Sequence, residues 1–193
     1  MKKKIIYIAI LLICLSLVTG GTYAYYTAEA TARNVITTGG ISVTVVEQED
    51  VSGTLQPYPS QPIKIMPATE VSKIVSVRSD GQAAWIRVNY TLAIYDAEGK
   101  VMDIPAEELD EAIRINAGSE DWTLKDGWWY YDTAIKGGQI STPLFREVVF
   151  SGTHIDNKYQ GCTLEILVTT QAVQQANNGT SVGEALGWPE DEA

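Results

Sequence analysis

Hydrophobic and polar side chains alternate along much of the chain, which is the pattern of β-strands with one buried face. Residues 84–95, AWIRVNYTLAIY, show it most clearly, because isoleucine, valine, tyrosine and leucine alternate there with arginine, asparagine and threonine. Branched and aromatic residues are also concentrated in further runs. We expect extended structure at residues 41–45, 71–77, 128–135, 144–150 and 163–170.

Dipeptides that end in glycine, such as Asp80-Gly81, Asp126-Gly127 and Ser151-Gly152, separate these runs and predict turns between them. Short strands with this spacing are typical of one antiparallel β-sandwich or jelly-roll domain, so the fold class is mainly β. Pro105, followed by Glu107 and apolar residues at helical spacing, predicts one short surface helix over about 105–115. Residues 55–67 hold four prolines and are expected to form a stiff loop or an edge crossing.

The first 24 residues have the composition of a signal peptide. Three lysines precede an apolar run over residues 5–18, and small residues at 22 and 24 predict cleavage between Ala24 and Tyr25. An uncleaved membrane anchor is the alternative, but the apolar run is shorter than the roughly 20 residues that cross a bilayer. We therefore expect a signal peptide (1–24), an N-terminal segment (25–38), a β domain (39–188) and an acidic tail (189–193).

Charge and cysteine content narrow the class of protein. Residues 25–193 carry 11 basic and 24 acidic side chains, a formal charge of −13, which makes nucleic acid an unfavourable partner. Cys162 is the single cysteine in this range, so no internal disulfide is predicted. In a strand it faces the same side as Leu164, Ile166 and Val168, because all four are at even positions. This indicates a buried small hydrophobe rather than a reactive thiol.

The residues needed for hydrolytic chemistry are sparse. His154 is the only histidine, and zinc proteases of the usual kind need two histidines one helical turn apart. No serine stands in a nucleophile elbow, and Cys162 has the parity of a core residue. Two stretches, Asp96 to Glu98 with Gly99 and Ser119 to Asp121, could supply oxygen ligands to calcium, but neither follows the twelve-residue calcium-loop pattern. We predict no catalytic residue, no metal and no cofactor, and keep a secreted hydrolase only as the weakest alternative.

Four consecutive aromatic residues, Trp128, Trp129, Tyr130 and Tyr131, form a possible partner or glycan surface. Stacking on sugar rings would make the protein a monomeric carbohydrate-binding module at the cell surface. Successive side chains of a strand point to opposite faces, however, so all four cannot form one platform. We therefore favour alternate packing, inward and onto an edge or partner surface.

The segment after the predicted cleavage site has its own pattern. Even positions from 26 to 36 are mostly small and apolar, whereas odd positions 27 to 33 are polar. Drawn as a strand, it has a thin apolar edge that fits a narrow groove between sheets. A helical turn or a disordered N-terminus are the alternatives. The residues of this candidate donor strand are Tyr26, Ala28, Ala30, Ala32 and Ile36.

Four parts of the sequence carry a family resemblance: the junction GGTYAYYTA, the following TTGGISVTV, the segment NKYQGCTLEILVTTQAVQ, and DGWWYYD with a later TPLF. Together they resemble the TasA and camelysin family of secreted Gram-positive proteins. The resemblance implies a jelly-roll fold, processing by a dedicated signal peptidase and, for the matrix members, polymerisation into biofilm fibres. Some relatives are labelled proteases, although this chain lacks their histidine ligands.

The family resemblance changes the interpretation of the N-terminal segment, because in such fibres the freed N-terminus of one subunit completes the sheet of the next. It favours a donor strand over residues 25–37. The expected partners are further copies of the chain, head to tail, a minor matrix or anchor protein, and a signal peptidase. The membrane is a partner only during export, and the expected location is the extracellular matrix or the cell surface.

Overall fold

The computed structural model describes residues 35–36 and 40–189. The predicted signal peptide, the cleavage site at Ala24 and Tyr25, and four of the five predicted donor residues (Tyr26, Ala28, Ala30 and Ala32) lie outside the described residues. Helices long and apolar enough to cross a bilayer are absent from the described ranges.

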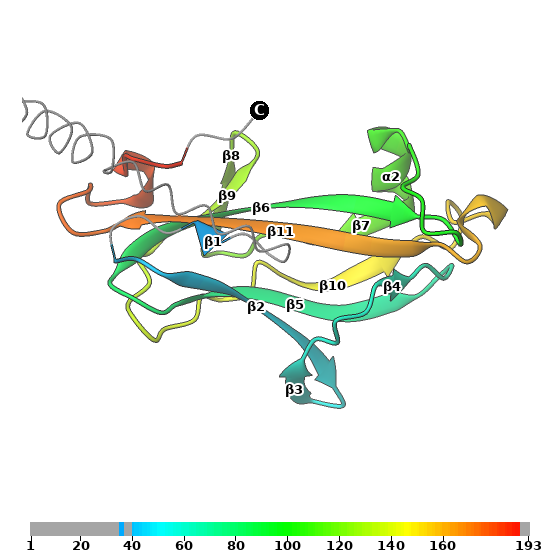
Figure 1. Cartoon of the computed structure of the whole chain (residues 1–193), viewed down its shortest axis with the longest axis horizontal. Coiled ribbons are helices and arrows are strands. Elements are labelled where there is room, and N and C mark those ends of the chain that lie inside the picture. The colour runs from blue at the N-terminus through cyan, green and yellow to red at the C-terminus, as the bar shows by residue number, and fades with distance from the viewer. Residues whose placement is uncertain (1–34, 37–39, 190–193) are drawn as a thin grey trace, which may run out of the picture. The chain divides into compact units, whose positions relative to one another are not determined.

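The described residues form two mostly antiparallel sheets (Figure 1). The first has the order β1 (Val35–Ile36), β11 (Thr163–Gln174), β6 (Ala84–Tyr95), β9 (Trp128–Tyr131) and β8 (Trp122–Lys125), with β4 (Ile63–Lys64) also paired to β11. The second has the order β3 (Thr54–Pro57), β2 (Val43–Val51), β5 (Glu70–Ser79), β10 (Phe145–Phe150) and β7 (Ile113–Ile115). The predicted β-sandwich is confirmed.

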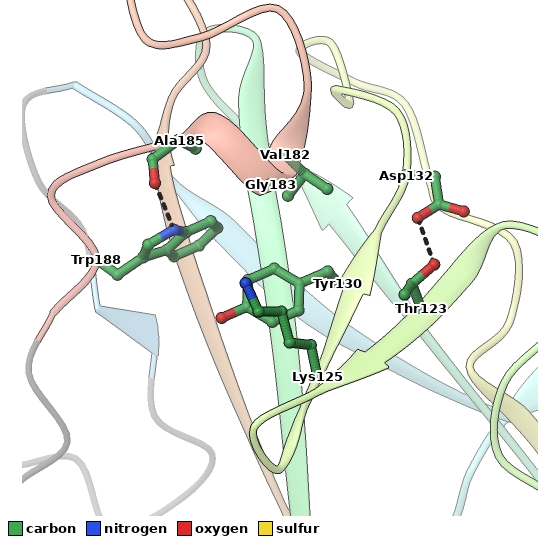
Figure 2. A pocket seen from close by; sticks show the side chains of 8 residues that line it. All are labelled: Thr123, Lys125, Tyr130, Asp132, Val182, Gly183, Ala185 and Trp188. Atoms are coloured by element: carbon green, nitrogen blue, oxygen red, sulfur yellow. Dashed lines mark hydrogen bonds between the residues drawn. The ribbon is translucent and has the colours of Figure 1, made fainter.

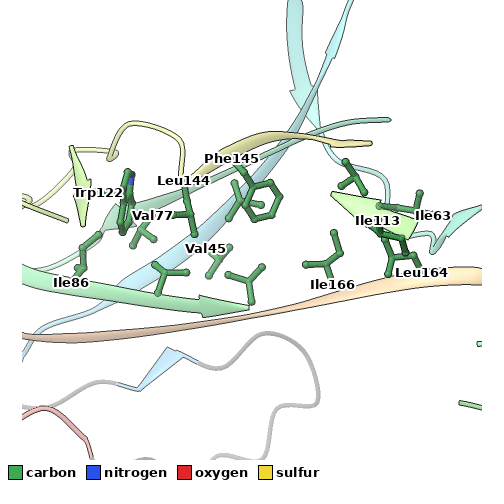
Figure 3. Close-up of a cluster of buried hydrophobic side chains, with 14 of the residues drawn as sticks. Val45, Ile63, Val77, Ile86, Ile113, Trp122, Leu144, Phe145, Leu164 and Ile166 are labelled. Carbon is green, nitrogen blue, oxygen red and sulfur yellow. The ribbon is translucent and has the colours of Figure 1, made fainter. Parts of the chain in front are cut away.

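The hydrophobic core lies between the two sheets, as the alternating pattern requires (Figure 3). From the first sheet, Ile86 and Val88 of β6 are fully buried in it. From the second sheet, Val77 of β5 and Phe145 of β10 face them. Because each strand places every second side chain in this layer, the outer faces are left to other contacts.

The predicted helix is present but shorter than expected. Helix α2 spans Ala106–Ala112, and the chain then continues directly into β7. Ile113 and Ile115 are β-branched and pair with β10, so the last residues of the predicted helix form a strand of the second sheet instead. The proline-rich segment supplies β3 and β4, which pair along only a few residues of their neighbours.

The described residues end in a C-terminal strap, residues 182–189, which includes the short 3-10 helix η2 (Val182–Glu184). Val182 and Ala185 pack with Trp85 of β6 and Val173 of β11 in a second, smaller hydrophobic cluster. The side-chain amide of Asn178 fixes the strap by donating to the Leu186 carbonyl at 2.9 Å and accepting from the Leu186 N–H at 2.8 Å. The predicted acidic tail therefore starts, at residue 189, where this well-packed strap ends.

Candidate functional site

Strand β11 has one completely paired edge. It is antiparallel to β6 along its whole length, from Thr163 opposite Tyr95 to Gln174 opposite Ala84. The residues that face the core, among them Ile166, Val168 and Thr170, are buried. This edge and this face hold β11 firmly in the sandwich.

Among the described residues, the other edge of β11 is paired only at its two ends. Strand β4 pairs with Thr163 and Leu164, and β1 pairs in parallel with Thr170 and Gln171. Between them, no described residue forms a ladder with residues 165–169 on this side, and we call this stretch the open edge. Unpaired backbone N–H and C=O groups along a strand are a template for another strand.

Within the described part of the chain, the neighbouring edge of the second sheet is also only partly paired. Strand β2 pairs with β5 over residues 43–48, and its other side pairs with β3 over residues 48–51. Both β1 and β11 approach β2 to within 8 Å between Cα atoms. The open edge of β11 and the first half of β2 therefore border the same side of the sandwich, beside β1 (Figure 1).

Ile36 is the one predicted donor residue that the structure describes. Its backbone pairs with Gln171 of its own chain in β1, rather than standing free for a neighbour. The pairing involves only Val35 and Ile36, directly beyond the open edge. The assignment of Tyr26, Ala28, Ala30 and Ala32 to the donor strand remains a prediction.

The aromatic cluster of β9 is divided between the two faces of its sheet. Trp129 and Tyr131 pack with the main core, whereas Tyr130 packs with the second cluster beneath the strap. The guanidinium carbon of Arg87 lies 4.3 Å from the Trp128 ring centroid, on the strap side. The four side chains thus form no single platform.

Arg87 connects the aromatic cluster to the strap. Its guanidinium donates to Gln171 Oε1 at 2.8 Å, to the Tyr130 hydroxyl at 3.1 Å and to the Pro189 carbonyl at 3.1 Å. The Trp188 ring centroid lies 5.0 Å from the guanidinium carbon, within cation–π distance. The sequence analysis missed Trp188 because its partners are far away in the chain.

His154 lies near Ser151 and Glu111, a combination of residue types that hydrolases use. Its Nδ1 is 3.1 Å from Ser151 Oγ, and its Nε2 is 3.7 Å from Glu111 Oε2. The serine hydroxyl, however, accepts the backbone N–H groups of Thr153 and His154, as in a hydroxyl-stabilised turn. The Glu111 distance is too long for an orienting hydrogen bond, so this arrangement is best explained as a loop contact.

Cys162 faces the core, as its alternation with core residues predicted. It is 3% exposed, and its sulfur lies 3.5 Å from Met102 Sδ and from the Lys158 carbonyl oxygen. Burial, with the negative charges of Asp96 and Glu98, raises the pKa of the thiol. The prediction that Cys162 is buried is confirmed.

The described residues define a two-sheet β-sandwich protein, in which they leave residues 165–169 of β11 unpaired on one side. Residues 1–57 match the family model described as camelysin metallo-endopeptidase. Over these residues the chain is similar to the camelysin and TasA family, so the resemblance noted from the sequence motifs is confirmed there. No curated protein matches the chain.

The family description implies a metal, and the side chains present do not fit one. Within residues 35–36 and 40–189, no group of three or more His, Cys, Asp or Glu side chains is arranged to hold an ion. The histidine Nδ1 is already shared between the hydroxyls of Ser151 and Thr153, and Cys162 is buried beside a methionine. We derive no metal-dependent step from this donor set.

Proposed function

We propose that the protein is a secreted structural subunit of the biofilm matrix. Cleavage after Ala24 frees residues 25–34 of one subunit, which pair with the open edge of the next and so build a fibre. The gap in pairing with described residues along 165–169 of β11 carries this proposal, because it would give a strand of another chain a place in the sheet.

Main-chain hydrogen bonds are the main source of attachment in this proposal. The candidate donor residues are mostly alanines, which bury little apolar area each, so side-chain packing alone gives weak binding. A strand added at the open edge instead satisfies donors and acceptors along the exposed side of β11. Small side chains also allow close approach to the neighbouring edge of β2.

The register of β1 favours exchange with a second chain. Val35 is opposite Thr170, so continuing the same ladder backwards would place Arg33 opposite Val168, a buried core-facing position. A register moved by one residue would place Ala32 there, and Ala30 opposite Ile166. In a parallel ladder such a shift moves every side chain to the other face. A neighbour's segment takes this register more easily, because it is not continuous with the β1 already paired beside it.

The contact uses two different surfaces, the N-terminal segment of one subunit and the open edge of another. Such heterologous contacts do not close on themselves unless the rotation between subunits forms a ring, so they produce filaments. The uncleaved signal peptide would tether the donor segment and prevent assembly before export.

Truncation of the N-terminus tests the proposal. We expect residues 25–193 to form filaments visible by electron microscopy, and a chain that starts at Gly39 to elute as a monomer in size-exclusion chromatography. A chain that starts at Asn34 is the matched control, because it keeps Val35 and Ile36 of β1 but lacks residues 25–33 of the proposed donor segment. It should also remain monomeric.

The comparison of the three chains is decisive in both directions. Donor-strand exchange is wrong if all three remain monomeric under conditions where each is folded by circular dichroism. It is equally wrong if the chain from Asn34 polymerises as well as the chain from Tyr25, because residues 25–33 would then be dispensable.

A further inference from the structure

A pocket of about 260 Å³ lies between the hairpin of β8 and β9 and the C-terminal strap (Figure 2). It lies on the outer face of the first sheet, and its lining includes none of the open-edge residues. Any ligand it holds is therefore independent of the proposed strand exchange. Its size is just below the roughly 300–1,000 Å³ of small-molecule sites, which suits one small ring.

The hairpin register gathers polar and aromatic side chains on this face. Asp126 and Gly127 both have positive φ, as a two-residue hairpin turn requires. The turn pairs Thr123 with Tyr130, so Thr123 and Tyr130 share one face. Lys125 lies two residues after Thr123 in β8 and so on the same face, and Asp132 directly follows the end of β9; both line the pocket.

Two aromatic rings form a corner of the pocket. The centroids of Tyr130 and Trp188 are 5.7 Å apart, with the ring planes at 87°. Arg87 donates to the Tyr130 hydroxyl, and the Trp188 Nε1–H donates to the Ala185 carbonyl at 3.1 Å. Because these contacts hold both rings in place, little ordering cost remains for a ligand.

The polar lining offers one cation and one anion. Thr123 Oγ1 donates to Asp132 Oδ1 at 2.9 Å, which orients this exposed carboxylate. Lys125 supplies N–H donors from the neighbouring strand, and both side chains line the same pocket (Figure 2). A cationic ligand would meet Lys125 and the nearby Arg87, whereas an anionic ligand would meet Asp132.

We propose that this pocket binds a neutral hexopyranose unit of a polysaccharide. A sugar ring has an apolar face that packs against Tyr130 or Trp188, and hydroxyl groups that donate to Asp132 and accept from Lys125. For a matrix protein, such a site would attach the subunit to surrounding glycan. Of the aromatic residues singled out in the sequence, only Tyr130 lines it, and Trp188 supplies the second ring.

Saturation-transfer NMR on the purified protein tests the proposal with D-glucose, D-galactose and D-mannose as probes. We expect transfer to at least one of these sugars, with millimolar affinity. Asp132→Asn and Lys125→Met should each weaken binding about tenfold, since each removes hydrogen bonds made with a charged group. Leu186→Ala is the matched control, because Leu186 is 77% exposed in the same strap and does not line the pocket.

Three results would overturn the proposal. The first is the absence of transfer to all three sugars, and the second is equal transfer in both pocket variants and the wild type. The third is binding restricted to D-glucuronate or D-glucosamine, the charged comparison probes, which would show that the pocket selects charge rather than a neutral ring. Both pocket variants change exposed side chains, so the fold should be retained, as amide NMR spectra can check.

Discussion

Thr170 is a polar side chain in an apolar position. It is 0% exposed, and its Oγ1 has no hydrogen-bond partner among the described residues. Val168 and Ala172, its neighbours on the same face of β11, belong to the hydrophobic core. A buried hydroxyl without a partner loses its bonds to water and gains nothing in return.

Replacing this hydroxyl with a methyl group should stabilise the fold. We expect Thr170→Val to raise the free energy of unfolding by about 1 kcal/mol, because the shape is kept and the desolvation cost is removed. Urea denaturation of both proteins measures the difference. Thr169→Val, on the partly exposed outer face, should change stability by less than about 0.5 kcal/mol. A less stable Thr170→Val would show that the hydroxyl has a partner in solution.

The burial of a single side chain could be predicted from sequence where alternation along a strand alone decides which face it lies on. Cys162 is buried because it alternates with core residues, a pattern visible along the strand. Trp188 was not predictable, since its contacts with Arg87 and Tyr130 join parts of the chain that no local pattern connects. The same is true of the approach of Glu111 to His154, which depends on how α2 packs beside a later loop.

Helix α2 is fastened to the 3-10 helix η1 (Asn157–Tyr159) by a single carboxylate. Glu108 accepts a hydrogen bond from the Tyr159 hydroxyl at 2.8 Å and pairs with the Lys158 ammonium. The hydrogen bonds from Lys158 and Tyr159 lower the pKa of Glu108. Burial and the carboxylate of Glu108 raise the pKa of Tyr159, so this phenol remains a donor at neutral pH.

The lowered pKa of Glu108 makes this contact sensitive to acid. Its pKa in the folded state lies below the unfolded value of about 4.3, so its contribution is complete at neutral pH and is lost as the pH falls through these values. We expect Glu108→Gln to be less stable than the wild type at pH 7, with a smaller difference at pH 3. Urea denaturation at both pH values measures this, with the exposed Glu107→Gln as control. A gap that is equal at both pH values would contradict it.

The strands themselves could be located from sequence because alternation and turn residues are local signals. Their pairing could not, since β11 lies between β6 and β1, and these neighbours are distant in sequence. The end of α2 also depended on tertiary pairing, because Ile113 and Ile115 prefer a sheet only when β10 is beside them. The open edge is likewise a property of the assembled sheets, and no sequence pattern predicts it.

The first sheet of the sandwich has two different edge regions, one at β8 and one at β11. The β8 border carries Leu124, which is 56% exposed, and the β11 border carries Leu167, which is 46% exposed. Only the second lies on the open edge that the proposed assembly uses. The two leucines therefore form a matched pair for testing which border takes part in assembly.

A charge at the open edge should oppose addition of a strand, as lysine does on natural edge strands. We expect Leu167→Lys in the chain 25–193 to raise the critical concentration for filament formation about tenfold, equivalent to about 1.4 kcal/mol. Leu124→Lys should assemble like the parent. Sedimentation of the polymer, with electron microscopy of the pellet, measures both. Equal loss in the two variants, or none in either, would place the contact elsewhere.

The burial of Cys162 has a practical consequence for following such filaments. Its raised pKa leaves little thiolate at neutral pH, and its sulfur is shielded from reagents by surrounding side chains. A cysteine introduced at an exposed position, such as Thr133, would therefore be the preferred target of a maleimide dye. In the chain 25–193 the introduced cysteine would be the one accessible thiol, so growth of the proposed filaments could be followed by fluorescence without first removing Cys162.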